Sequence, residues 1–234
     1  MIPKTIHYCW FGKGKKGALI ESCIASWKRV LPDYKIVEWN EENYPITPEK
    51  TFAYRRYAEK KWAFVSDYAR LEILAERGGI YLDTDMFLYK PLDDFLANGC
   101  FLGKEDAVHV SAGIIGAVPD HPYILACKKW YDEHPDIITP IPKVLTSVYE
   151  KNPDLQAGVN IYEQKYFYPY SAETVKRFDP KNPPAGAYAA HLWNYGWGHP
   201  LNRFFKKIGI HRLGTTAAEK LGIKNILKRI FGFI

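Results

Sequence analysis

Cysteine is scarce in this chain, with four among 234 residues. Cys9, Cys23, Cys100 and Cys127 are far apart and show no close-paired spacing of the kind that binds zinc. We therefore expect reduced, partly buried thiols rather than a disulfide framework. The sequence also lacks a run of roughly 18 apolar residues, which a membrane-spanning helix needs. Its first residues do not have the basic-then-apolar order of a secretory signal. These absences predict a cytoplasmic protein.

The body of the chain has no excess of positive charge, although the formal net charge of the whole sequence is +6. Residues 201–234 contain eight Lys and Arg against one Glu, which gives +7 there and leaves −1 for residues 1–200. A nucleic-acid-binding domain is expected to carry its basic residues on the folded body. We therefore expect no nucleic-acid partner.

The basic residues belong to an amphipathic C-terminal segment. Apolar residues between positions 223 and 234 recur at helical spacing and predict one apolar helix face. Such a helix can bind the headgroups of an anionic membrane, or it can dock on the folded body with its lysines in water. We favour the membrane, and predict a domain of residues 1–210 followed by a tail of residues 211–234. The lysines form a separate row: Lys220, Lys224 and Lys228.

Hydrophobic periodicity and turn residues divide the body into alternating strands and helices. The pair Gly78-Gly79 is typical of the end of a helix. Strand–helix alternation predicts an α/β layered domain with a mainly parallel central sheet. The expected strands cover residues 2–10 and 34–39 and begin again at residue 80, and the expected helices cover residues 18–30 and 59–77.

Asp83 and Asp85 follow the strand that begins at residue 80. Because side chains alternate along a strand, we expect Tyr81, Asp83 and Asp85 to share one face. Two adjacent carboxylates repel each other unless a cation lies between them, and hard oxygen ligands select Mg²⁺ or Mn²⁺. Such an ion can bridge to a diphosphate and neutralise a leaving group. The pair could also be two solvated turn residues. A phosphatase pair would normally lie on the first strand.

The helix before this strand offers a second group of polar residues. Asp67 and Arg70 are three residues apart and therefore lie on one helix face, with Ser66 beside them. A carboxylate and a guanidinium on one face can bind the hydroxyls of a ribose or a sugar. An ordinary ion pair within the helix is the alternative.

Three ordered blocks of this sequence resemble family 32 glycosyltransferases. The blocks are IPKTIHYCWFG at residues 2–12, FVSDYAR at residues 64–70 and GGIYLDTD at residues 78–85. The family includes bacterial polysaccharide transferases and fungal α-mannosyltransferases, and the clostridial glucosylating toxins share its core. The resemblance implies a GT-A-like fold, a nucleotide-sugar donor, a divalent cation and retention of the anomeric configuration.

The resemblance also implies a role for each matching residue. Trp10 would stack on the nucleotide base. Arg70, Asp83 and Asp85 would form the catalytic centre, in which the two aspartates bind Mn²⁺ or Mg²⁺. The residues implied to contact the nucleotide sugar are Trp10, Ser66, Asp67, Arg70, Tyr81 and Asp83.

Residues 190–197 resemble the C-terminal block HxWxxSW of the family, with Gly196 in place of the usual serine. His191 could be a third metal ligand or a structural histidine. Trp193 and Trp197 could cover the donor, support the acceptor or pack in the core.

The acceptor side is less well marked. Residues 111–117 fit the acceptor-side loop of the family only loosely, and Glu105 and His109 are the candidate acceptor residues near it.

These observations predict a retaining, metal-dependent glycosyltransferase. We expect it to move a hexose or N-acetylhexosamine from a nucleotide-diphosphate sugar, with UDP favoured, to a glycan acceptor. The acceptor is expected to be lipid-linked, in surface polysaccharide synthesis at the inner face of a bacterial cell membrane. One alternative is a GDP-mannose-dependent α-mannosyltransferase, and another is a non-catalytic carbohydrate-binding protein of the membrane surface.

Overall fold

The computed structural model describes residues 1–194. The predicted tail, the predicted boundary at residue 210, and Gly196 and Trp197 lie outside the described residues, so what was predicted of them stays a prediction. Within residues 1–194, the helices are too short or too polar to cross a membrane.

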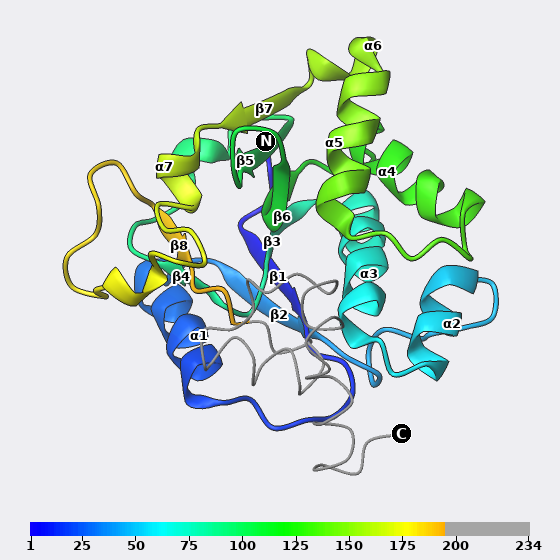
Figure 1. The fold of residues 1–234 in the computed structure, drawn as a ribbon, viewed down its shortest axis with the longest axis horizontal. Helices are drawn as coiled ribbons and strands as arrows, with labels where there is room; N and C mark the ends of the chain where they lie inside the picture. The colour runs from blue at the N-terminus through cyan, green and yellow to red at the C-terminus, as the bar shows by residue number, and fades with distance from the viewer. Residues whose placement is uncertain (195–234) are drawn as a thin grey trace, which may run out of the picture. The chain divides into compact units, whose positions relative to one another are not determined.

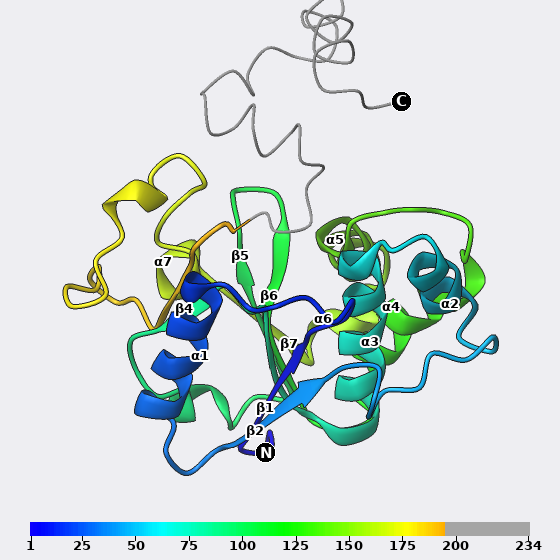
Figure 2. The same cartoon turned by 90° about the horizontal axis from the view of Figure 1, so that it is seen from below.

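A six-stranded sheet forms the centre of the described region (Figures 1 and 2). Five strands run in one direction, and β6 alone runs against them. β6 is antiparallel because a short turn connects it to its neighbour β5, and a parallel pairing would need a long crossover. The predicted mainly parallel sheet is thus confirmed, with one antiparallel strand. Its spatial order is β2 (Lys35–Trp39), β1 (Thr5–Cys9), β3 (Gly79–Leu82), β6 (Val110–Ala117), β5 (Cys100–Lys104) and β7 (Val159–Tyr162).

Helices and a second, smaller sheet cover the two faces of the central sheet (Figures 1 and 2). One face is covered by α3 (Trp62–Arg77) and α5 (Ile141–Lys151), with α2 (Thr51–Ala58) and α4 (Pro122–Glu133) packed on them. The other carries α1 (Ala18–Val30), α7 (Gln164–Phe167) and a two-stranded sheet of β4 (Met86–Leu88) and β8 (Ala189–His191). The short α6 (Pro153–Gln156) follows α5, and two 3₁₀ turns lie at Asp93–Phe95 and Val175–Arg177.

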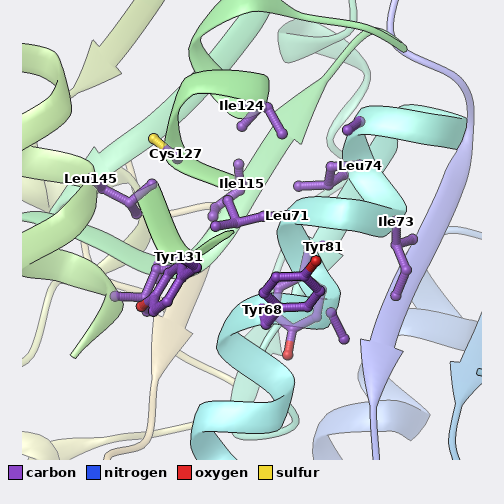
Figure 3. Close-up of a cluster of buried hydrophobic side chains, with 14 of the residues drawn as sticks. Tyr68, Leu71, Ile73, Leu74, Tyr81, Ile115, Ile124, Cys127, Tyr131 and Leu145 are labelled. Atoms are coloured by element: carbon purple, nitrogen blue, oxygen red, sulfur yellow. The ribbon is translucent and has the colours of Figure 1, made fainter. Parts of the chain in front are cut away.

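The central strand β3 lies between two hydrophobic clusters, one on each face of the sheet. Ile80 and Leu82 belong to one cluster, and Tyr81, which is 2% exposed, belongs to the other. Figure 3 shows Tyr81 among apolar side chains of α3 and β6. Tyr81 thus lies on the face opposite Ile80 and Leu82, where it is buried and its hydroxyl donates to Asp83 Oδ1 at 3.3 Å. A strand with layers on both sides has no solvent face.

Local sequence signals placed most elements of the N-terminal half correctly. α1 has the predicted bounds, and β1 and β2 lie within the predicted strands. The helix predicted from residue 59 begins at Trp62, because Lys60 adopts a positive φ of 56° and so cannot be part of the helix. The sequence prediction missed α2, since eight residues are too few for a clear helical period.

The Gly78-Gly79 pair joins α3 to β3 with no intervening loop. Both glycines have positive φ, and a Cβ on Gly79 would lie 2.8 Å from both His7 Nε2 and the Thr5 carbonyl oxygen. His7 Nδ1 accepts a hydrogen bond of 3.1 Å from Trp39 Nε1, so the neutral ring carries its proton on Nε2, which donates to the Gly78 carbonyl at 3.0 Å. Burial lowers the pKa of His7 to about 4. His7 thus ties β1 and β2 to the end of α3.

Candidate active site

The candidate site lies at one edge of the central sheet. β1, β3 and β5 run in the same direction, so their carboxyl ends meet at that edge. Trp10 follows β1, Asp83 follows β3 and Glu105 follows β5. In open α/β sheets, ligands bind outside the carboxyl ends of the strands. The fold therefore brings together polar residues that are far apart in the sequence.

A tight turn, rather than strand alternation, brings Asp83 and Asp85 together. β3 ends at Leu82, and the Met86 amide donates to the Asp83 carbonyl at 2.9 Å. The Asp83 amide donates to the Gly113 carbonyl at 2.8 Å, which holds the turn against β6. The proposed strand-face argument for Asp85 is thus wrong, although both carboxylates still reach one site.

His191 reaches this turn through the small sheet. β8 pairs with β4 so that His191 is opposite Met86, and His191 Nε2 lies 3.1 Å from Asp85 Oδ1. The segment after β8 wraps around the same carboxylate, since the Asn194 amide donates to Asp85 Oδ2 at 2.8 Å. The Leu192 amide donates to the Asp85 carbonyl at 2.9 Å. The third predicted metal ligand therefore lies beside the acidic pair.

Asp83, Asp85 and His191 form a possible metal cluster. One ligand atom of each lies within 4.8 Å of the others, and their side chains are 29%, 13% and 15% exposed. His191 Nε2 and Asp85 Oδ1 are 3.1 Å apart, the distance of a hydrogen bond, so these two groups are held together. His191 Nδ1 is buried with no hydrogen-bond partner among residues 1–194. These residues fit Mg²⁺ or Mn²⁺.

Arg70 links helix α3 to the acidic turn. Its Nη1 donates to Asp83 Oδ1 at 3.0 Å and to the Ala112 carbonyl at 2.9 Å, and its Nη2 donates to Asp67 Oδ1 at 2.8 Å. The guanidinium also lies 4.4 Å from the centre of the Tyr81 ring, within the range of a cation–π contact. Arg70 thus orients Asp83 from a position that is itself buried.

The other predicted donor-site residues differ in their surroundings. Asp67 is 7% exposed and accepts a hydrogen bond from the Ile141 amide at the start of α5. Ser66 Oγ donates to the Trp62 carbonyl at 3.1 Å. Trp10 is not part of the Arg70 network. Its Nε1 donates to the Gly14 carbonyl at 2.6 Å.

The charges of the cluster are only partly balanced by the protein. Burial raises the pKa of Asp83. Arg70 acts to lower this pKa, and the nearby Asp85 acts to raise it further. Burial also acts to raise the pKa of Asp85, but His191 and the Asn194 amide outweigh it and the pKa is lowered. Burial acts to lower the pKa of His191, yet Asp85 raises it. A divalent cation bound between the two carboxylates would stabilise their ionised forms against the effect of burial.

A β-bulge beside the site was missed from the sequence. Leu102 pairs with Ile115 but Gly103 pairs with Ser111, so three residues of β6 have no partner on β5. The carbonyls of two of them, Ala112 and Gly113, accept hydrogen bonds from Arg70 and Asp83. Glycines inside a strand are a known signal of a bulge, and Gly103 and Gly113 could have marked this one.

Sequence comparisons connect the chain to enzymes that transfer sugars. Residues 18–102 match a family described as the glycosyltransferase sugar-binding region containing a DXD motif, which includes Asp83-Thr84-Asp85. A human α-1,4-N-acetylglucosaminyltransferase is 28% identical over 187 residues, covering 72% of this chain and 50% of that protein. Inositol phosphoceramide mannosyltransferase 2 of Schizosaccharomyces pombe is 33% identical over 135 residues, covering 53% and 36%. The chain spans half or less of these relatives.

Solved structures share the fold. The glycosyltransferase domain of the YGT toxin matches with a TM-score of 0.58 and 9% identity, over 74% of this chain and 82% of that chain. The PaToxG glycosyltransferase matches with a TM-score of 0.56 and 20% identity, over 67% and 72%. At such identities the likeness concerns the fold alone, an α/β GT-A-like domain.

Proposed function

We propose that this chain, whose residues 18–102 match the glycosyltransferase sugar-binding region containing a DXD motif, transfers a hexose or N-acetylhexosamine from a nucleotide-diphosphate sugar to a glycan acceptor. The observation that carries this proposal is the convergence of Asp83, Asp85 and His191 beside the buried Arg70. A non-catalytic carbohydrate-binding protein would need neither the acidic pair nor a guanidinium aimed at it.

The proposed chemistry is the departure of the nucleotide diphosphate as the sugar moves to the acceptor. A bound Mn²⁺ or Mg²⁺ would neutralise charge on the diphosphate. Asp83, Asp85 and His191 would hold the ion, and Arg70 keeps Asp83 in place for it. Trp10, at the end of β1, would stack on the base. Ser66, Asp67 and Tyr81 would line the sugar and ribose part of the site.

We propose retention of configuration, the course that the resemblance to family 32 glycosyltransferases implies. In a retaining transfer without an enzyme nucleophile, the acceptor attacks from the side on which the diphosphate leaves. The acceptor proton then passes to the departing phosphate. The chain's own part is to orient both groups and to exclude water, which is where precise positioning lowers the barrier.

A thermal-shift panel of UDP-sugars and GDP-sugars, each with and without Mn²⁺, tests the donor. We expect one nucleotide class to raise the melting temperature only when Mn²⁺ is present, because a ligand that binds the folded state stabilises it. UDP is favoured, and stabilisation by GDP-mannose would support the α-mannosyltransferase alternative. No metal-dependent shift with any donor would contradict the proposed function.

For the acceptor we propose a lipid-linked glycan of surface polysaccharide synthesis, reached at the inner face of the cell membrane. Supporting it are the ceramide named in relatives such as the S. pombe mannosyltransferase and the basic, apolar spacing of residues 211–234. Co-sedimentation with liposomes rich in phosphatidylglycerol tests this. Deleting residues 220–234 should abolish binding, and unchanged binding of the shortened protein would exclude the tail as the anchor.

A further inference from the structure

Glu105 is a carboxylate at the site edge that the proposed mechanism does not yet use. It begins the turn between β5 and β6, where its amide donates to the His109 carbonyl at 3.0 Å. Asp106 Oδ1 closes this turn by accepting from the Val108 and His109 amides, both at 2.7 Å. The turn is thus built by its own backbone bonds, and the Glu105 side chain is not required to hold it together.

The structure distinguishes Glu105 from the other acceptor-side candidate, His109. His109 Nδ1 lies 3.0 Å from Asp106 Oδ2, and these side chains are 42% and 53% exposed. Glu105 is half-buried, and its carboxylate accepts a hydrogen bond from the buried Ser111 hydroxyl. The Glu105 carboxylate also interacts electrostatically with His191, one of the proposed metal ligands. Both residues are half-buried, but Glu105 interacts with Ser111 and His191, whereas His109 pairs with Asp106.

Two buried hydroxyls lie behind Glu105. The Ile114 amide donates to the Tyr168 hydroxyl at 3.0 Å, and Ser111 interacts with both Tyr168 and Glu105. Because an ionised carboxylate can only accept a hydrogen bond, Ser111 is the donor to Glu105. This holds one side of the carboxylate and leaves its remaining lone pairs for a ligand.

The order of the strands indicates which ligand this is. Trp10, the acidic pair and Glu105 follow β1, β3 and β5, and these strands lie in that order across the sheet with β6 between the last two. A donor with its base at Trp10 and its diphosphate at Asp83 would extend toward β5. The molecule that meets the transferred sugar beyond the diphosphate is the acceptor.

We propose that Glu105 binds the attacking hydroxyl of the acceptor and orients it toward the donor sugar. The inference rests on the proposed transferase function. In the transfer, the bond between the sugar carbon and the phosphate oxygen breaks, and a bond to the acceptor oxygen forms. The acceptor proton leaves on the departing phosphate. Glu105 accepts a hydrogen bond from the hydroxyl before that transfer and forms no covalent bond.

Water serves as the probe acceptor, so the test does not depend on knowing the glycan. Hydrolysis of the UDP-sugar is followed as UDP release by the full-length protein with Mn²⁺. Glu105→Gln keeps the shape and an acceptor for Ser111 but removes the charge. We expect the kcat of hydrolysis to fall about tenfold to hundredfold, as for a lost charge-assisted hydrogen bond. The donor KM and the Mn²⁺-dependent thermal shift with UDP should remain within about twofold.

The matched control is Glu163→Gln. Glu163 follows β7 on the same edge, next to β5, and is exposed and paired with Lys165. The Glu163→Gln protein should hydrolyse the donor at the wild-type rate. Ser111→Ala keeps the Glu105 charge but removes the hydroxyl that holds it. Its loss in kcat should be smaller, and adding it to Glu105→Gln should cost little more, because both act on one carboxylate.

Wild-type hydrolysis by Glu105→Gln would overturn the inference, as would an equal loss in Glu163→Gln. A Glu105→Gln protein that no longer responds to UDP and Mn²⁺ would place the residue on the donor side and also overturn it. A wild type that neither binds UDP with Mn²⁺ nor releases UDP would overturn the proposed function, and the role of Glu105 with it.

Discussion

Two histidines mark two different regions of this protein. His7 lies where β3 begins, and His191 lies just beyond the turn where β3 ends. Both are mostly buried, yet burial lowers the pKa of His7 to about 4, while Asp85 raises the pKa of His191 against the effect of its burial. The two ring nitrogens of His7 have protein partners, but Nδ1 of His191 has none among the described residues.

The difference separates a residue that maintains the fold from one that is available for function. His7 is neutral and both of its ring nitrogens are hydrogen-bonded, and it joins β1 and β2 to the end of α3. His191 lies against two carboxylates and retains ligand capacity, which is typical of a site that binds a cation. Residue type and burial alone do not distinguish the two, whereas their hydrogen-bond partners do.

The largest effect is expected from Asp85→Ala at the end of β3. The kcat of sugar transfer or donor hydrolysis should fall about 10³-fold, because several kcal/mol of charge stabilisation through the ion would be lost. UDP release and the Mn²⁺-dependent thermal shift with UDP measure it. Asp154→Ala, at an exposed position of α6, is the control and should be unaffected. Normal sugar transfer by the Asp85→Ala protein would show that the region around Asp85 and His191 is not the functional site.

Measuring stability as a function of pH tests whether neutral His7 stabilises the fold. The folded-state pKa of about 4 is below the ordinary 6.5, so the unfolded chain binds the proton more tightly. The stabilisation by neutral His7 is therefore complete above pH 6.5 and is lost as the pH falls toward 4. The difference amounts to about 3 kcal/mol.

Urea unfolding of the metal-free protein at several pH values between 7.5 and 4.5 measures this loss. His7→Gln, which does not titrate in this range, should lose less stability over the same interval, whatever its stability at pH 7.5. An equal loss in both proteins would show that other groups cause the acid sensitivity.

His191→Ala should weaken Mn²⁺ affinity at least tenfold, since loss of even a residue that only supports a metal ligand costs about tenfold to hundredfold in affinity. Isothermal titration with Mn²⁺ in the presence of UDP measures it. His7→Gln is the control from the other region and should leave Mn²⁺ affinity unchanged. If both variants weaken Mn²⁺ binding equally, His191 acts through the fold and not as a ligand.

The smallest effect is expected from Trp10, which lies three residues after His7 on the same stretch of chain. Trp10→Ala should lower UDP affinity about tenfold, as for the loss of one stacking contact with a base. Trp10→Phe keeps an aromatic face and should recover most of the affinity. Titration of UDP with Mn²⁺ measures both, and equal binding by all three proteins would exclude Trp10 from the base site.

The local sequence determined the elements whose signals lie within a few residues. The bounds of α1 followed from helical spacing, and the end of α3 followed from Gly78-Gly79. The three ordered blocks, the last of which contains Asp83 and Asp85, also predicted the family and the acidic site. Periodicity and turn chemistry act over single turns of chain, so the sequence displays them directly.

Only the tertiary structure decided how distant groups meet. His191 reaches Asp85 across 106 residues because β8 pairs with β4, and Arg70 reaches Asp83 beside a bulge in β6. Tyr81 is buried because layers cover both faces of β3, which the pattern of one strand does not reveal. Strand pairing and layer packing depend on partners elsewhere in the chain. The sequence by itself therefore identified most of the site residues. The fold alone decided which of their charged side chains lie next to one another.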